Sequence, residues 1–303
     1  MEHWQEQSFS YFLKEREIME NQWRKTAAIL VVSFGTSYND TREATIGAIE
    51  RTIADTFSDY KVYRAFTSQV IINKLKERDH LEIDNVAEAV NRAAKDGVRE
   101  LFVQPTHLMD GYEYHDILAE LSENADKFDK ITVGAPLLTS DEDFQAVARA
   151  ITAQTASYDD GKTAICFMGH GTEAASNSVY EKMQKTLTEN GFENYYIATV
   201  EAAPELTDMM ARLKEKGGYE KVVLQPLMVV AGDHANNDMA GGEEDSWKSV
   251  LLREGYKVEC ILKGLGQINA IRDIYAEHLK TALMDGKKYL EGTAEGTGLL
   301  CQR

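Results

Sequence analysis

Two histidines and one glutamate have the residue types and surroundings of a metal site. His170 lies between two glycines in FMGHGT, His234 lies in AGDHANND, and Glu201 lies in TVEAAP. Two imidazoles and a carboxylate suit zinc, cobalt, nickel or ferrous iron better than magnesium or calcium, which prefer all-oxygen shells. Three protein ligands also leave positions open for a substrate. Because the three residues are far apart in the sequence, only the fold can bring them together.

The elements around these residues alternate between short β-branched runs and helical stretches. Ile46, Ile49, Ile53 and Phe57, for example, have the three- and four-residue spacing of a helix face. Alternation of this kind is typical of parallel sheets with helices on both faces. The predicted strands are Ala28–Ser33, Lys61–Phe66, Glu100–Gln104, Lys130–Gly134, Thr163–Met168, Tyr195–Val200, Lys221–Pro226 and Lys257–Leu262.

The two halves of the chain also match each other. AILVVSFGTS (28–37) aligns with AICFMGHGTE (164–173), and ELFVQPTHLMDGYEY (100–114) aligns with KVVLQPLMVVAGDHA (221–235). We therefore predict an α/β protein of two similar domains, each a parallel four-stranded sheet flanked by helices, with a cleft between them. The predicted segments are an N-terminal helical extension (1–25), an N-terminal domain (26–152), a C-terminal domain with the metal site (153–285) and a flexible tail (286–303).

Ligands of such sheets bind beyond the carboxyl ends of the strands, which is where the metal-site residues fall. His170 directly follows the first strand of its half, at the position of Phe34. His234 follows the third strand, at the position of Glu113, and Glu201 follows the second. Glu113 is therefore expected to approach the metal from the other domain, across the cleft.

The remaining histidines and the cysteines carry weaker signals. His107 and His115 lie near strand ends, so they are expected close to the cleft, most often without a direct role. Cys166 and Cys260 lie in apolar runs and are expected to be buried thiols without disulfides. His3, His80 and His278 are expected at the surface.

Composition excludes several classes of protein. The chain has 303 residues and a net charge of −17, and it is 43% hydrophobic and 27% charged, which indicates a globular protein and disfavours nucleic acid as a partner. It contains no apolar run long enough for a membrane span and no signal peptide, so we expect a cytoplasmic location. SFGTSY (33–38) matches neither the P-loop nor the dinucleotide-binding fingerprint, and we expect no organic cofactor.

Several longer motifs resemble those of the class II chelatases, and within them the anaerobic cobalt chelatases of the CbiK type. They are LVVSFGTSYNDTR, QPTHLMDGYEYHDI, FMGHGT, VEAAPEL and QPLMVVAGDHANNDMAGGEEDSWKS, spread over roughly residues 26–283. The resemblance implies ATP-independent insertion of Co²⁺ into sirohydrochlorin, a tetrapyrrole, in anaerobic cobalamin biosynthesis. Here Co²⁺ is a substrate.

The resemblance also implies roles for individual residues. His170, Glu201 and His234 match metal-binding residues, and His170, Glu113 and His234 match catalytic ones. A neutral imidazole can both ligate the ion and accept a pyrrole proton. Contacts to the tetrapyrrole are expected from Ser33, Phe34, Gly35, Thr36, Met109 and Arg64.

A negatively charged protein acting on a substrate with eight carboxylates needs local cations, and Arg42, Arg64 and Lys248 are the candidates near strand ends or the rim. Three alternatives stay open: a chelatase for Fe²⁺ or Ni²⁺ with a related tetrapyrrole, a carrier of metal or tetrapyrrole, and a metal-free α/β protein. Affinity rank alone does not decide the metal. The sequence also leaves open a homo-oligomer.

Overall fold

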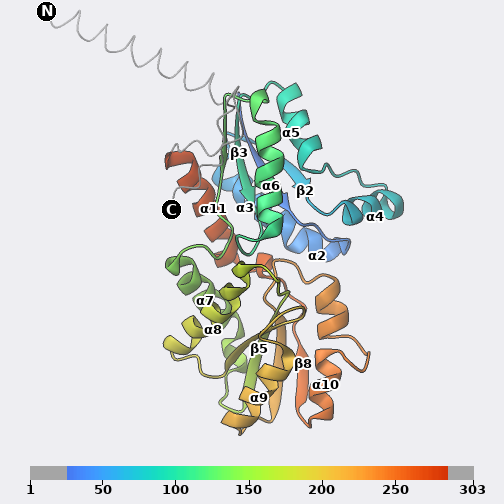
Figure 1. Cartoon of the computed structure of the whole chain (residues 1–303), viewed down its shortest axis with the longest axis vertical. Helices are drawn as coiled ribbons and strands as arrows, with labels where there is room; N and C mark the ends of the chain where they lie inside the picture. Colours follow the sequence, from blue (N-terminus) through green and yellow to red (C-terminus); the bar gives the residue numbers. More distant parts are fainter. Residues whose placement is uncertain (1–25, 286–303) are drawn as a thin grey trace, which may run out of the picture.

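Two parallel sheets form the two lobes of the computed structural model, which describes residues 26–285 (Figure 1). The predicted extension (1–25) and tail (286–303) lie outside the described residues. The first sheet has the order β2-β1-β3-β4 and the second the order β6-β5-β7-β8, and every neighbouring pair of strands is parallel. The strands are β1 (Ala27–Ser33), β2 (Lys61–Phe66), β3 (Glu100–Pro105), β4 (Lys130–Val133), β5 (Thr163–Gly169), β6 (Tyr195–Thr199), β7 (Lys221–Pro226) and β8 (Lys257–Cys260).

These strands confirm the predicted fold class. The largest difference is in the last strand, which was predicted to run to Leu262 but ends at Cys260. The internal match is also confirmed at the level of pairing: Val32 of β1 pairs with Pro105 of β3, and the aligned Met168 of β5 pairs with Pro226 of β7.

Helices connect the strands, as parallel pairing requires. Their ends carry recognisable signals: Asn85 and Glu88 form a capping box at the start of α5, and the Ser68 side chain accepts a hydrogen bond at the start of α4. The α-helices are α2 (Asn39–Ala44), α3 (Ile46–Thr56), α4 (Gln69–Asp79), α5 (Val86–Lys95), α6 (Tyr112–Glu123), α7 (Asp141–Thr155), α8 (Ser178–Glu189), α9 (Leu206–Lys216), α10 (Trp247–Arg253) and α11 (Asn269–Asp285). Shorter turns are η1 (Ala125–Lys127), η2 (Ala156–Tyr158), η3 (Ala175–Asn177), the π-helical η4 (Ala235–Met239) and η5 (Leu265–Gln267).

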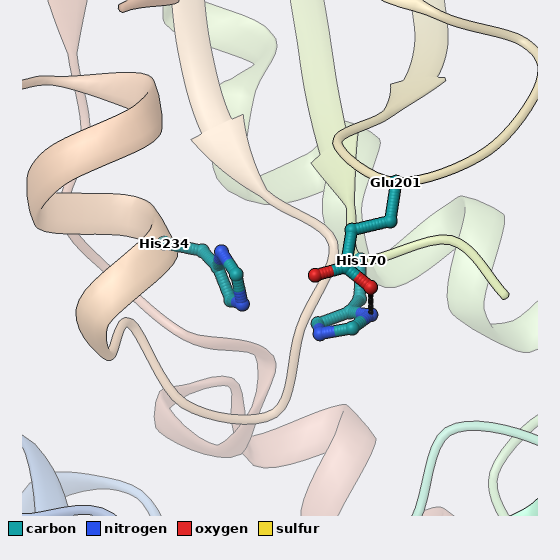
Figure 2. Close-up of side chains that lie close together, drawn as sticks. All are labelled: His170, Glu201 and His234. Carbon is teal, nitrogen blue, oxygen red and sulfur yellow. Dashed lines mark ion pairs between the residues drawn. The ribbon is translucent and has the colours of Figure 1, made fainter.

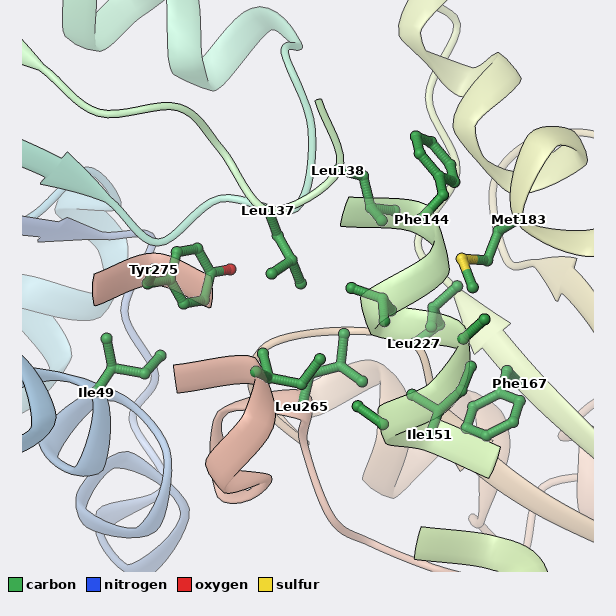
Figure 3. Packing of buried hydrophobic residues seen from close by; sticks show 14 of the residues in the cluster. Ile49, Leu137, Leu138, Phe144, Ile151, Phe167, Met183, Leu227, Leu265 and Tyr275 are labelled. Atoms are coloured by element: carbon green, nitrogen blue, oxygen red, sulfur yellow. The ribbon is translucent and has the colours of Figure 1, made fainter. Parts of the chain in front are cut away.

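The hydrophobic core has three main layers, because alternate residues of a strand point to opposite faces of its sheet. Leu30 of β1 packs into an outer cluster with residues of α5 and α6, and Cys166 of β5 packs into the equivalent outer cluster of the second sheet. Ile29 and Phe167 belong instead to one central cluster that contains residues of both sheets. Figure 3 shows part of this cluster, including Phe167. The two lobes are therefore joined by a shared apolar layer.

The last helix, α11, returns to the first sheet and contacts α3, α7 and β3. Tyr275 on α11 is fully buried, and its hydroxyl donates to the backbone carbonyl of Thr106 (2.9 Å) after β3. The predicted boundary at residue 152 falls inside α7. The limits 26–152 and 153–285 stay a prediction.

His278 was predicted at the surface, and this was wrong. Its imidazole is only 14% exposed, with Nε2 2.8 Å from Asp143 Oδ1 on α7 and Nδ1 3.2 Å from the carbonyl oxygen of Ala135. The residue is covered because α11 packs back across the chain. His80 is exposed, as predicted, and ends α4 with a positive φ of 55°.

The burial prediction is confirmed for Cys166, whereas Cys260 is less covered than predicted. Cys166 is fully buried, Cys260 is half-buried, and neither forms a disulfide. Burial raises the pKa of both thiols, so they are poor nucleophiles and ligands. Within residues 26–285, no helix combines the length and apolar character that crossing a membrane requires.

Candidate metal centre and active site

A cleft of about 770 Å³ lies at the carboxyl ends of the strands and is lined by residues from both halves of the chain. The first half contributes the segments after β1, β2 and β3, and the second half contributes those after β5, β6 and β7. Apolar surface predominates in its lining. Its volume is in the range of clefts that hold cofactor-sized ligands.

His170, Glu201 and His234 lie together on the wall of this cleft formed by the second half (Figure 2). One potential ligand atom of each residue lies within 4.8 Å of the others. Ligand atoms that bind a transition metal at about 2.1 Å lie roughly 3.5 Å apart, so a small contraction of the cluster completes the site. The sequence prediction that the fold gathers these three residues agrees with the structure.

The backbone around His170 explains its position. Gly171 has a φ of +88°, and a side chain there would approach the backbone nitrogen of Ala202 to 2.8 Å. This close packing lets the carbonyl of His170 accept a hydrogen bond from the backbone N–H of Glu201 (2.9 Å). His170 and Glu201 are thus held together by their own main chains.

The imidazoles of both histidines are oriented by their Nδ1 atoms. Nδ1 of His170 donates to the carbonyl of Gly171 (2.8 Å), and Nδ1 of His234 donates to Oδ2 of Asp238 (2.7 Å). Carboxylate and carbonyl partners of this kind select the tautomer that leaves Nε2 with a free lone pair. The two rings are arranged edge to face, perpendicular to each other, with centroids 4.7 Å apart.

Asp238 was not among the sequence candidates. It lies on η4, the π-helical turn that directly follows His234, so a spacing of four residues places both side chains on one face. The sequence signal that could have found Asp238 is its spacing: a carboxylate one helical turn after a candidate metal-binding histidine can orient that histidine.

Glu113 occupies the first turn of α6, in the half of the chain that does not contain His170, Glu201 and His234, and it lines the same cleft. Its side chain is 56% exposed within the cleft, while the surrounding walls desolvate it enough to raise its pKa; the nearby imidazole of His170 partly opposes this shift. Nε2 of His107 lies 3.9 Å from Oε2 of Glu113.

Five of the six residues expected to contact a tetrapyrrole line the cleft: Ser33, Phe34, Gly35, Thr36 and Met109. Phe34 is 45% exposed, which is unusual for a large apolar side chain and leaves its ring available to a ligand. Arg64 is not among the lining residues. Its guanidinium binds the carboxylate of Glu50 on α3, with Nε 2.7 Å from Oε1.

The other expected cations also lie away from the cleft, because neither Arg42 nor Lys248 lines it. Lys74 on α4 is instead the one lysine or arginine among the lining residues of the described chain. It lies inside α4 and does not directly follow β2, so strand-end reasoning alone did not identify it. His115 is exposed, pairs with Asp110 (2.8 Å) and does not line the cleft.

Comparison with known proteins places the chain among tetrapyrrole chelatases. The family model described as "Cobalt chelatase (CbiK)" matches residues 27–284. The sirohydrochlorin cobaltochelatase of Salmonella typhimurium is 38% identical over 256 residues, covering 84% of this chain and 96% of the relative. The sirohydrochlorin cobaltochelatase CbiKC of Nitratidesulfovibrio vulgaris is 32% identical over 257 residues, covering 84% and 90%.

A solved structure shows a similar fold at low identity. SirB from Bacillus subtilis with Fe³⁺ superposes with a TM-score of 0.62 at 14% identity, covering 86% of this chain and 97% of SirB. At this identity the likeness concerns the fold alone.

Proposed function

This chain belongs to the cobalt chelatase (CbiK) family, and from that premise we propose that it inserts Co²⁺ into sirohydrochlorin. The observation that carries the proposal is the cluster of His170, Glu201 and His234 on one wall of a cleft lined by both halves of the chain. In this reaction two pyrrole N–H bonds break and Co²⁺ exchanges its ligands for the four ring nitrogens. The protein must therefore hold the ion, seat the macrocycle and accept protons. No organic cofactor is needed for these steps.

The metal cluster is proposed to bind Co²⁺ as a substrate. Neutral imidazole is a good ligand for cobalt, and the Glu201 carboxylate offsets part of the charge of the dication. With three protein ligands, the ion keeps open positions toward the macrocycle. The exposure of all three side chains to the cleft supports direct transfer to the ring nitrogens.

The tetrapyrrole is proposed to lie between the two walls, with its ring against apolar side chains. Phe34, Met109 and Val229 line the cleft beside the metal cluster and suit the faces of a macrocycle. Ser33, Gly35 and Thr36 are the sequence neighbours of Phe34 and also line the cleft. Lys74 is proposed to bind one of the substrate carboxylates.

The two pyrrole protons need two acceptors. Glu113 lines the cleft from the first half of the chain and is proposed to take one proton as the N–H bond breaks, the electron pair staying on nitrogen. His170 is proposed to take the other after it releases Co²⁺, because its Nε2 lone pair becomes free at that point. His234 remains a ligand and is held by Asp238.

Anaerobic absorbance spectroscopy tests the proposal. We expect purified protein to convert sirohydrochlorin and Co²⁺ to the cobalt chelate much faster than a protein-free control. Substituting Fe²⁺ or Ni²⁺ for Co²⁺ ranks the metals and tests the alternative chelatase reactions. A bound but unmetallated tetrapyrrole would make the chain a carrier, and an unchanged spectrum would contradict both. The cytoplasmic location and a homo-oligomer stay predictions.

A further inference from the structure

His107 is the most deeply buried histidine of the cleft, and its ring nitrogens lack hydrogen-bond partners. Its side chain is 7% exposed, and neither Nδ1 nor Nε2 has a hydrogen-bond partner. A buried polar group without a partner costs free energy, so its presence calls for an explanation. The residue lines the cleft and is absent from the metal cluster.

The internal repeat shows that the fold does not need a histidine here. His107 is the second residue after β3, and Met228 is the second residue after β7. Their backbones make the same bonds: the carbonyl of His107 accepts from Leu137 N–H (3.0 Å), and that of Met228 accepts from Leu265 N–H (2.8 Å). An apolar side chain thus serves the equivalent position, and the imidazole of His107 has another purpose.

The backbone of His107 is anchored and its ring is buried, whereas the side chain of its neighbour Glu113 is exposed. The His107 carbonyl is bonded to Leu137 N–H and also lies 3.3 Å from the hydroxyl of Tyr275, which anchors the backbone to α11. The Glu113 side chain, in contrast, is 56% exposed in the cleft. A modest side-chain rotation of Glu113 closes the 3.9 Å between Oε2 and Nε2 of His107 to hydrogen-bond length, about 2.8 Å.

We infer that His107 is a positioning residue whose Nε2 accepts a hydrogen bond from Glu113 once Glu113 has taken a pyrrole proton. This inference rests on the proposed function. In the step, the macrocycle N–H bond breaks, an O–H bond forms on Glu113, and the nitrogen keeps the electron pair that it offers to Co²⁺. The O–H then points at the Nε2 lone pair, which holds Glu113 away from the metallated ring.

The protonation state of His107 agrees with this role. Burial lowers the pKa of His107 to about 4, so the imidazole is neutral near pH 7 and has one lone pair to offer. With its proton on Nδ1, Nε2 is the acceptor. A charged histidine in this place would have no lone pair for Glu113.

A double-mutant cycle tests the inference. His107→Met copies the equivalent residue of the second half, and His107→Gln keeps an acceptor oxygen near the place of Nε2. We expect His107→Met to lower kcat about 10- to 100-fold, with KM for sirohydrochlorin and the Kd for Co²⁺ within about twofold of the wild type. His107→Gln should recover most of the loss. In a Glu113→Gln background, His107→Met should have no further effect, because its partner is gone.

His115→Gln on α6 is the matched control, since His115 is exposed and outside the cleft lining. Three outcomes would each overturn the inference. They are a wild-type kcat in His107→Met, an equal loss of kcat in the Met and Gln variants, and the same fold-loss of kcat with and without Glu113. If His107→Met does not fold, His107→Asn is used in its place. The side-chain oxygen of Asn lies near the place of Nδ1, so His107→Asn should not restore kcat. Absence of Co²⁺ insertion by the wild type would instead contradict the proposed function.

Discussion

Phe34 and His170 occupy equivalent positions in the two halves of the chain. Each directly follows the central strand of its sheet and precedes a glycine with positive φ, 102° at Gly35 and 88° at Gly171. The same backbone turn thus presents an aromatic ring from one half and an imidazole, the proposed metal ligand, from the other. Glu113 and His234 are likewise at equivalent positions, after β3 and after β7, and they differ in residue type in the same way. The two halves thus share a backbone frame, and the two walls of the cleft carry different side chains.

Replacing either imidazole of the metal cluster should abolish most activity. We expect His170→Ala and His234→Ala to weaken Co²⁺ binding and to lower turnover by more than about 100-fold, because each removes a ligand. Both side chains are exposed to the cleft, 48% and 32%, so thermal unfolding should change little. Titration with Co²⁺ and the anaerobic absorbance assay measure the two effects. Normal activity in either variant would show that the metal site lies elsewhere.

Asp238 should affect metal binding without touching the metal. Asp238→Asn exchanges the carboxylate that accepts from Nδ1 of His234, and we expect the affinity for Co²⁺ to fall about 10- to 100-fold. Asp245→Asn, an exposed acidic residue in the loop after η4, is the control for loss of charge. Isothermal titration with Co²⁺ separates the two variants. Equal affinities would mean that His234 is oriented by other contacts.

Glu113 should cost the folded protein stability at neutral pH. Its pKa is raised above the ordinary value of 4.5, mainly by desolvation, so the folded state binds its proton more tightly than the unfolded state. Stability from this group therefore falls as the pH rises from about 4.5 through the raised pKa and stays lower above it. We expect Glu113→Gln to raise Tm modestly at pH 7 while lowering kcat. Calorimetric scans at pH 4 and pH 7 measure this. The gain in Tm of Glu113→Gln over the wild type should be larger at pH 7 than at pH 4. A smaller gain at pH 7 would contradict the direction of the pKa shift.

The contact between Asp143 and His278 should stabilise the attachment of α11. Asp143→Ala removes the partner of His278 and the side chain that accepts from Ser140 N–H (2.7 Å), and we expect a loss of about 1–3 kcal/mol in the free energy of unfolding. Glu142→Ala, its exposed neighbour, is the control. Urea unfolding measures both variants.

The same contact should depend on pH. Desolvation acts to raise the pKa of Asp143, but bonds to His278 and Ser140 outweigh it and hold the pKa below its ordinary value of 3.8. The folded state therefore releases this proton more readily, and the stabilisation present above about pH 4 is lost as the pH falls through the lowered pKa. The difference between wild type and Asp143→Ala should shrink at pH 3. A constant difference would point to packing alone.

Lys74 should contribute to substrate binding more than to chemistry. We expect Lys74→Ala to raise KM for sirohydrochlorin several-fold with little change in kcat, and Lys74→Arg to restore most of it. Lys76→Ala on the same helix is the matched control, because Lys76 pairs with Glu82 and does not line the cleft. Steady-state kinetics at two salt concentrations make the comparison, since screening weakens an exposed charge contact. Unchanged KM would indicate that the carboxylates are bound elsewhere.

The local pattern of the sequence was enough to predict the two parallel sheets and the meeting of His170, Glu201 and His234. Strand and helix periods are local properties, and parallel strands end at one edge of their sheet, so residues that directly follow strands must gather there. Phe34 and Met109, which the family resemblance implied as contacts of the tetrapyrrole, also line the cleft.

Only the tertiary structure decided where long side chains and the last helix lie. Arg64 binds Glu50 of α3 instead of facing the cleft, and Lys74 takes the place that three other cations were predicted to fill. His278 is covered because α11 packs on the first sheet, and Tyr275 of the same helix anchors the backbone of His107. These pairings join residues that are distant in the sequence. They depend on how the helices and strands pack against one another, which the local spacing of residues in the sequence does not reveal.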